Sequence, residues 1–459
     1  MKHYDVIIVG AGPAGIFAAH ELVSSKKGLK ILILEKGRDI DKRVCPVKTE
    51  KGSCKPCAVC GLLCGWGGAG AFSDGKLNLS KDIGGNLTKY VDGPTLGKLI
   101  TYTDSIYQRY GAPSHVYGDD TDRVEALKNV AEKNGLELIP SRIRHIGTDR
   151  CPELLKKIKA ELNSKIDIVF SKYVRTILLE NDKVNGVKTE NGDVIYGDFV
   201  ILAPGREGSL WLEEQARAMG FSLLKNPVDI GVRVEVPASV LEPLTRVIYE
   251  PKLIFYSKKF NDRIRTFCVN PYGEVVKEYV KGVWSVNGHS YSNRSTNNTN
   301  FALLVSTFFT EPFDEPHLYG RYIAKLANLL GDGVILQRLG DLQAGRRSTP
   351  ARIARGRVKP TLEDAVPGDL SFVLPYRYIS NILEMLKTID KIAPGINSRH
   401  TLLYGVEVKF YSRQLKLDRN LETEIENLFA IGDGAGVSRG LIQASVSGVM
   451  AAREILNRV

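Results

Sequence analysis

The sequence contains no long apolar run. Its apolar stretches, such as residues 6–9 and 31–34, are far shorter than the ~20 residues that a membrane-spanning helix needs. A secretory leader would have a basic flank, then an apolar stretch, then a cleavage site of small residues. The first residues lack this succession, so no secretory leader is expected. Internal repeats and low-complexity segments are absent as well. These absences predict a soluble globular protein without a membrane span, for which a cytoplasmic location is the default expectation.

Charge of one sign is not concentrated along most of the chain. The 459 residues carry a formal net charge of +11, but lysines and arginines alternate with acids, and we expect no binding to nucleic acid. One segment, residues 342–361, has no acid. We interpret it as a solvated basic loop, with an anion-binding site as the alternative. Its basic residues are Arg346, Arg347, Arg352, Arg355, Arg357 and Lys359.

A glycine turn near the start predicts a dinucleotide site. Gly10, Gly12 and Gly15 have the G-x-G-x-x-G spacing between an apolar strand and a helix, and Glu35 ends the next strand. Such glycines allow a tight turn, close approach to a pyrophosphate, and close packing of helix on strand. The helix N-terminus favours the phosphates, and Glu35 is positioned to bind a ribose.

Two later segments favour FAD over NAD. Gly432 and Asp433 follow an apolar strand and precede a long helix, which resembles the motif that holds the ribityl chain of FAD. The segment VILAPG, ending at Gly205, resembles a strand and glycine turn beside the same cofactor. The candidate FAD-binding residues are Gly10, Gly12, Pro13, Ala14, Gly15, Glu35, Lys36, Arg38, Gly67, Gly68, Ala69, Val174, Ala203, Pro204, Gly205, Gly432, Asp433 and Gly434.

The order of these three motifs resembles the glutathione-reductase-like, two-dinucleotide-binding flavoprotein superfamily over the whole chain. Residues 67–77, 144–149, 229–237, 265–276 and 405–409 resemble, more narrowly, a family of FAD-dependent dehydrogenases. The resemblance implies FAD and redox chemistry, and it implies no particular substrate. The cysteines between residues 45 and 64 would place the chain in a cysteine-bearing branch of that family.

Five of the seven cysteines lie close together, which in a cytosolic protein favours metal or redox chemistry over disulfides. They are Cys45, Cys54, Cys57, Cys60 and Cys64. The last four have the spacing of a bacterial ferredoxin segment, and Cys45 precedes a proline as a remote cluster ligand often does. We predict a [4Fe–4S] cluster with Cys54, Cys57 and Cys60 as three ligands and either Cys45 or Cys64 as the fourth. The alternatives are zinc, a thiol/disulfide relay, and thiols without a ligand.

The cysteine segment runs into the glycine loop 65–70. Gly65, Gly67 and Gly70 repeat the G-x-G-x-x-G spacing, but no strand precedes them, so we interpret them as backbone clearance beside the pyrophosphate and flavin. No second Rossmann unit is recognisable. We therefore expect electrons to pass between the flavin and a ferredoxin-like partner through the cluster, with NAD(P)H as the alternative donor.

The predicted fold is α/β, with a Rossmann-like FAD-binding domain assembled from both termini and an inserted, β-rich substrate domain. The expected boundaries are residues 1–44, 81–215 and 401–459 for the FAD-binding domain, 45–80 for the cysteine and flavin loop, and 216–400 for the inserted domain. Asn185-Gly186 and Asn191-Gly192 are expected to be hairpin turns of an antiparallel meander.

The predicted function is that of an FAD-dependent oxidoreductase with a small organic substrate. Two rival hypotheses are a flavin electron carrier or redox sensor without its own substrate, and a tRNA-modifying flavoprotein. Ser73 and Lys76 could face the flavin ring, with a surface or capping role as the alternative for each. The candidate catalytic residues are Ser73, Lys76, His145, Tyr272 and Arg346.

Overall fold

The computed structural model describes residues 2–45, 57–224, 226–280, 282–291, 295–313 and 315–459. The chain forms two compact units. The first comprises residues 1–115, 144–225 and 411–459, and the second comprises residues 116–143 and 226–410. Among the described residues, no helix is both long and apolar enough to cross a membrane.

The first unit is a Rossmann-like α/β domain. Its seven-stranded sheet of described residues has the order β6-β2-β1-β9-β8-β7, with β21 paired to β9. Strands β6, β2, β1, β9 and β21 are parallel, whereas β7, β8 and β9 form an antiparallel meander. The strands are β1 (His3–Val9), β2 (Ile31–Leu34), β6 (Asp167–Val169), β7 (Val174–Glu180), β8 (Lys183–Thr189), β9 (Val194–Leu202) and β21 (Leu428–Ala430).

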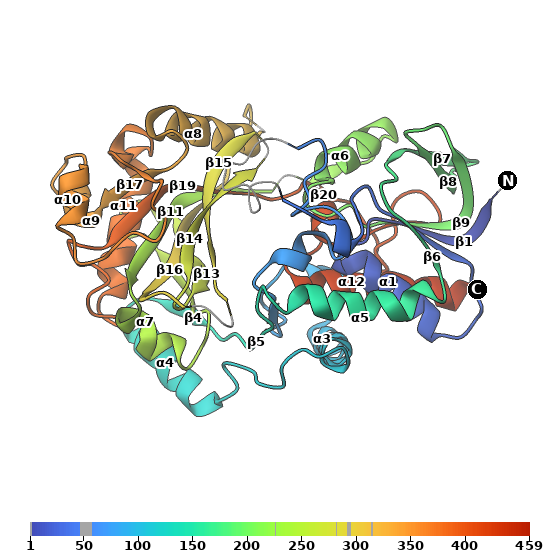
Figure 1. Ribbon diagram of the computed structural model, residues 1–459, viewed down its shortest axis with the longest axis horizontal. Helices are drawn as coiled ribbons and strands as arrows, with labels where there is room; N and C mark the ends of the chain where they lie inside the picture. Colours follow the sequence, from blue (N-terminus) through green and yellow to red (C-terminus); the bar gives the residue numbers. More distant parts are fainter. Residues whose placement is uncertain (1, 46–56, 225, 281, 292–294, 314) are drawn as a thin grey trace. The chain divides into compact units, whose positions relative to one another are not determined.

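The helices of this unit bury the central strands. Helix α1 (Pro13–Ser24) and helix α12 (Leu441–Arg458) lie side by side (Figure 1), and a Cβ atom on Gly448 would come within 2.1 Å of the Ala14 carbonyl oxygen. The segments before and after the inserted residues thus form one core. The remaining elements are η1 (Ile40–Lys42), η2 (Gly68–Phe72), β3 (Lys76–Asn78), η3 (Leu87–Lys89), α3 (Gly93–Arg109), β5 (Ile143–His145), α5 (Cys151–Asn163), α6 (Ser209–Ala218), β10 (Leu223–Leu224), β20 (Gln414–Leu415) and η5 (Asp433–Ala435).

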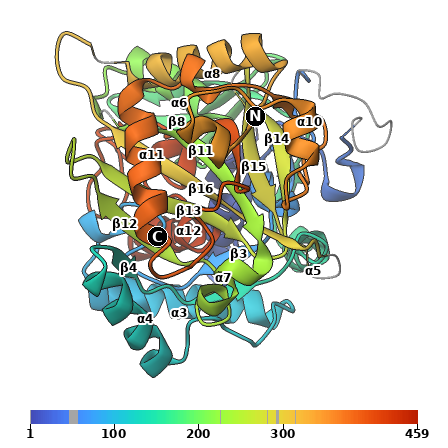
Figure 2. The ribbon, with the colours of Figure 1, turned by 90° about the vertical axis from the view of Figure 1, so that its left-hand side faces the viewer.

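The second unit is built on an eight-stranded sheet of described residues with the order β18-β17-β19-β11-β16-β13-β12-β4. Its strands are β4 (Glu137–Ile139), β11 (Val228–Pro237), β12 (Lys252–Tyr256), β13 (Arg263–Asn270), β16 (Asn298–Thr307), β17 (Ile335–Arg338), β18 (Val366–Pro367) and β19 (Leu402–Phe410). Figure 2 shows helix α11 (Tyr376–Ile389) running along this sheet. Its residues Ile382, Met385 and Ile389 belong to the same buried cluster as Val232 and Leu303.

Shorter elements complete this unit. A separate hairpin is formed by β14 (Glu274–Val280) and β15 (Val283–His289). The other helices are α4 (Thr121–Lys133), α7 (Ala238–Thr245), α8 (Pro316–Gly331), α9 (Leu339–Gln343), α10 (Pro350–Ala354) and η4 (Leu370–Phe372).

The structure confirms the predicted α/β class with its Rossmann-like FAD-binding fold, but places three segments differently from the expected boundaries. Residues 116–143 were expected in the FAD-binding domain; they belong to the second unit because β4 pairs with β12. Residues 216–225 stay with the first unit, where β10 pairs with β20, and the second unit continues to Phe410, the end of β19.

One of the two predicted hairpin turns is wrong. Gly186 lies inside β8, where the pairing with β7 shifts register, and the turn is made instead by Asn181 and Asp182 with positive φ angles of 50° and 60°. Short polar side chains tolerate this left-handed backbone, so Asn181-Asp182 can form the turn in place of Asn185-Gly186. Gly192, with a φ of 87°, lies in the turn between β8 and β9 as predicted.

Candidate functional site

Four glycine turns of the first unit meet beside the N-terminus of α1. Gly10 is so close to the end of β9 that a Cβ would lie 2.2 Å from the Ala203 carbonyl oxygen, and one on Gly434 would lie 2.5 Å from the Gly205 carbonyl oxygen. The Gly67 N–H donates to the Ala11 carbonyl oxygen at 2.7 Å. The predicted nucleotide motifs are thus brought together by the fold.

Within this group, Gly12 differs from its neighbours. A Cβ on Gly15 would lie 2.0 Å from the Gly10 carbonyl oxygen, but a Cβ on Gly12 would meet nothing within 4 Å. Gly205 likewise faces open space, with a φ of 64°. Gly12 precedes Pro13, the first residue of α1, so the open space adjoins a helix N-terminus. The residues present therefore fit a dinucleotide pyrophosphate.

Glu35 has a structural role that sequence reasoning missed. Its carboxylate is buried and accepts hydrogen bonds from the backbone N–H groups of Ala11 at 2.8 Å, Gly37 at 2.7 Å and Gly65 at 2.9 Å. Besides its predicted contact with ribose, the side chain ties the opening turn to the glycine loop. The sequence offered no signal for this contact, because Gly65 lies 30 positions away.

Asp433 lies at the other predicted cofactor motif. It begins η5, accepts a hydrogen bond from the Ser438 hydroxyl at 2.7 Å, and lies 3.6 Å from the Arg206 guanidinium. Burial raises the pKa of Asp433, whereas Arg206 and the Ser438 hydroxyl act in the opposite direction. The carboxylate side chain is 20% exposed and so remains accessible to a ligand.

The remaining cofactor candidates lie around these turns. Lys36 is 3.9 Å from Glu207, Arg38 is exposed, and Val174 is buried at the start of β7. Gly68 would bring a Cβ within 3.1 Å of the Gly12 Cα, and Pro204 and Ala69 are half-buried.

Lys76 and His145, two of the catalytic candidates, lie in a partly buried charged cluster of the first unit. Lys76 forms an ion pair with Asp74 at 2.9 Å, with the two side chains 9% and 16% exposed. Burial lowers the pKa of His145 to about 4, although Asp74 opposes the shift. Cys151 lies beside Gly75 in the same region, and burial raises the pKa of its thiol to about 12.

The other candidates have local partners. The Ser73 hydroxyl donates to the Gly70 carbonyl oxygen at 2.9 Å and accepts from the Gly75 N–H at 3.2 Å, which is the capping role of the alternative interpretation. Tyr272 and Arg346 belong to the second unit. The Tyr272 hydroxyl donates to Glu242 at 2.7 Å, and Arg346 lies 3.1 Å from Asp341.

The cysteine segment is only partly described, since Cys54 lies outside the described residues. Cys45 and Cys60 are half-buried, Cys57 is exposed and Cys64 is buried. In the described part of the chain, no three histidine, cysteine or acidic side chains are grouped so that they could hold a metal ion. Burial also raises the pKa of the Cys64 thiol to about 12. The described residues therefore give no support to the predicted cluster.

Arg43 organises this segment, and sequence reasoning missed it. Its guanidinium donates to the carbonyl oxygens of Gly61 at 2.9 Å, Leu62 at 2.7 Å and Trp66 at 2.6 Å. The Phe72 ring lies 4.8 Å from the same group. One buried cation thus holds both the cysteine segment and the start of the glycine loop.

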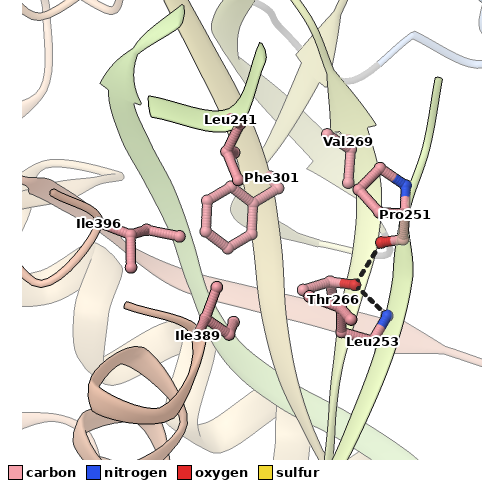
Figure 3. Close-up of a pocket in the computed structure, with 8 residues that line it drawn as sticks. All are labelled: Leu241, Pro251, Leu253, Thr266, Val269, Phe301, Ile389 and Ile396. Atoms are coloured by element: carbon pink, nitrogen blue, oxygen red, sulfur yellow. Dashed lines mark hydrogen bonds between the residues drawn. The ribbon is translucent and has the colours of Figure 1, made fainter. Parts of the chain in front are cut away.

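The second unit contains a small apolar cavity of about 10 Å³ (Figure 3). Its one polar side chain, Thr266, accepts from the Leu253 N–H at 2.8 Å and donates to the Pro251 carbonyl oxygen at 2.7 Å. This cavity is too small for a substrate, and we interpret it as a packing void. It is lined by Leu241, Pro251, Leu253, Thr266, Val269, Phe301, Ile389 and Ile396.

Two family models match the chain. Residues 227–410 match the C-terminal domain-like model of FAD-dependent proteins, and residues 5–47 match the model of lycopene cyclase proteins. An uncharacterized protein of Clostridium beijerinckii is 28% identical over 476 residues, covering 98% of this chain and 80% of that protein. The first match supports FAD as the cofactor of this protein.

Two solved structures align with this chain at low sequence identity and with low TM-scores. L-proline dehydrogenase from P. horikoshii is 12% identical, with a TM-score of 0.42, covering 100% of this chain and 94% of that chain. Glycine oxidase from Geobacillus kaustophilus is 13% identical, with a TM-score of 0.42, covering 100% and 95%.

Proposed function

We propose that this protein is an FAD-dependent oxidoreductase acting on a small organic substrate, and that it belongs to the cysteine-bearing branch of the glutathione-reductase-like dehydrogenases. The observation that carries the proposal is the open space at Gly12, which adjoins the N-terminus of α1 amid four packed glycine turns. The family match over residues 227–410 supports it independently. When bound, FAD supplies hydride and single-electron transfer.

In this proposal the protein binds and orients the cofactor. Backbone N–H groups at the start of α1 bind the pyrophosphate, whose approach requires a residue without a side chain at position 12. Glu35 binds the ribose while holding Gly65 in place, and Asp433 binds the ribityl chain.

We assign hydrogen bonding and charge stabilisation to the cluster around Asp74. Because burial lowers the pKa of His145 to about 4, its imidazole is neutral at pH 7 and would act as a hydrogen-bond partner more readily than as a base. The Asp74 carboxylate holds the Lys76 ammonium group, which could stabilise negative charge. Tyr272 and Arg346 remain candidates by the family resemblance and by chemical type, and their contacts with Glu242 and Asp341 add no support.

We also propose that the cysteine segment acquires a [4Fe–4S] cluster, with zinc as the alternative, and that a ferredoxin-like protein is the redox partner, with NAD(P)H as the alternative donor. The support is the spacing of Cys54, Cys57, Cys60 and Cys64. Iron and acid-labile sulfide analysis after anaerobic purification tests this separately from FAD. Absence of both elements would reject the cluster and leave the flavin proposal intact.

The experiment for FAD compares two glycine variants. Gly12→Ala adds a methyl group to open space, so it should keep the fold but lose most of the yellow cofactor, measured by absorbance and by FAD released on heating. Gly97→Ala is the matched control, because a Cβ there also meets nothing and the residue lies on α3. A colourless wild-type protein, or full FAD content in Gly12→Ala, would contradict the proposal.

Two further measurements test the rival functions. A protein that holds FAD but reduces only other proteins would be an electron carrier or redox sensor. Tight RNA binding at moderate salt would favour the tRNA-modifying alternative.

A further inference from the structure

The eight-stranded sheet of the second unit has one apolar and one charged face. Alternate residues of β11, including Val228, Ile230 and Val232, belong to the buried apolar cluster. The residues between them point to the opposite face. Because directly paired residues share a face, the register places Lys409 beside Asp229 on that opposite face. Glu407 lies two positions before Lys409 in β19 and therefore shares this face.

The same charged face continues across the sheet to β13. Leu304 pairs with Gly231 on one side and with Arg265 on the other, so Arg265 shares the face of Asp229 and Lys409. Phe267, two positions after Arg265, points the same way.

On this face the carboxylates lie deeper than the cations. Arg265 pairs with Asp229 at 2.6 Å, and the two side chains are 17% and 2% exposed. Lys409 pairs with Glu407 at 2.9 Å, with exposures of 14% and 0%. The fully buried Arg233 also binds Glu407, at 2.8 Å. These five groups are three cations and two carboxylates, and the partly exposed cations Arg265 and Lys409 lie outside the buried carboxylates.

An aromatic ring lies within this charged group. The Phe267 ring is 4.7 Å from the Arg265 guanidinium and 5.0 Å from the Lys252 ammonium group, and it is half-buried. Lys252 is itself paired with Glu250 and adds no net charge. A cation next to an accessible ring suits a planar organic acid better than an inorganic anion.

We propose that Arg265, Lys409 and Phe267 form a binding site for a small organic carboxylate. The buried carboxylates of Asp229 and Glu407 form ion pairs with Arg265 and Lys409, respectively. These ion pairs fix the positions of both cations before a ligand binds. This anion site does not depend on the proposed oxidoreductase function.

The test compares benzoate with benzamide, which has nearly the same shape but no charge. Isothermal titration calorimetry on the full-length protein should show benzoate binding about tenfold tighter than benzamide. Arg265→Gln and Lys409→Gln should each weaken benzoate by about tenfold and leave benzamide unchanged. The matched controls, Arg355→Gln and Lys325→Gln, remove exposed charges of the same unit and should bind as the wild type does.

Equal affinity for benzoate and benzamide, or tight benzoate binding in Arg265→Gln, would overturn the proposal. Phosphate binding more tightly than benzoate would overturn the organic class of the ligand. If Arg265→Gln fails to fold, Arg265→Lys keeps the charge and should retain a preference for benzoate, while an undiminished preference in a folded Lys409→Gln variant would still reject the site. FAD content is measured on the same samples. Absence of FAD would reject the proposed oxidoreductase function and leave the proposed anion site unaffected.

Discussion

The Glu35 carboxylate accepts a hydrogen bond from the Gly65 backbone N–H at 2.9 Å. This contact joins the end of β2 to the glycine loop that follows the cysteine segment. The same carboxylate binds the Ala11 N–H at 2.8 Å, so one buried group positions two turns of the proposed FAD site.

Glu35→Gln should weaken both the fold and FAD binding. The amide keeps the shape of the carboxylate but places an NH2 group against a backbone N–H donor. Losing these charge-assisted bonds should lower the free energy of unfolding by about 1–3 kcal/mol. Thermal melts and FAD titration measure the two effects, with Glu153→Gln on the exposed side of α5 as the control. Unchanged melting would contradict the structural role of Glu35.

Gly10→Ala should destabilise the protein, unlike Gly12→Ala. A Cβ at position 10 would lie 2.2 Å from the Ala203 carbonyl oxygen, and the φ of 111° is unfavourable for alanine. We expect a loss of about 3 kcal/mol for Gly10→Ala and a change within about 0.5 kcal/mol for Gly12→Ala in the absence of FAD. Urea unfolding of the two FAD-free variants checks this, and similar midpoints would refute it.

Stability should decrease as the pH is lowered through the range set by His145. Its folded pKa of about 4 lies below its ordinary 6.5, so between these values the unfolded chain binds a proton that the folded chain does not. The free energy of unfolding is unaffected by His145 above pH 6.5, and it falls by up to about 3 kcal/mol as the pH is lowered from 6.5 to 4. His145→Asn should flatten the stability profile across this range, whereas His115→Asn, at an exposed position, should not. Parallel stability profiles for the wild type and His145→Asn would disprove this role of His145.

Arg43→Gln should loosen the cysteine segment. The variant leaves carbonyl oxygens of Gly61, Leu62 and Trp66 without their donor, so the backbone on either side of Cys64 loses its anchor. Because burial raises the pKa of Cys64 to about 12, its thiol should react slowly with iodoacetamide in the metal-free wild-type protein at about pH 8. We expect labelling at Cys64, read by peptide mass spectrometry, to rise at least about tenfold. Arg38→Gln, at a nearby exposed position, is the control, and equal labelling in both variants would count against the role of Arg43.

Local sequence patterns determined the strand, glycine turn and helix around Gly10, Gly12 and Gly15, and the partnership of both chain ends in one Rossmann-like sheet. The strand, turn and helix depend on nearest neighbours and on apolar periodicity, which a sequence displays directly. The joining of both chain ends was predicted from the resemblance of the Gly432-Asp433 segment to a cofactor motif and not from periodicity. Tertiary structure alone decided that residues 116–143 join the second unit, that Glu35 binds Gly65, and that Arg43 holds the cysteine segment. Such contacts join backbone groups and strand edges far apart in the chain, and almost any residue type can supply a backbone N–H or carbonyl group, so no side-chain pattern announces them.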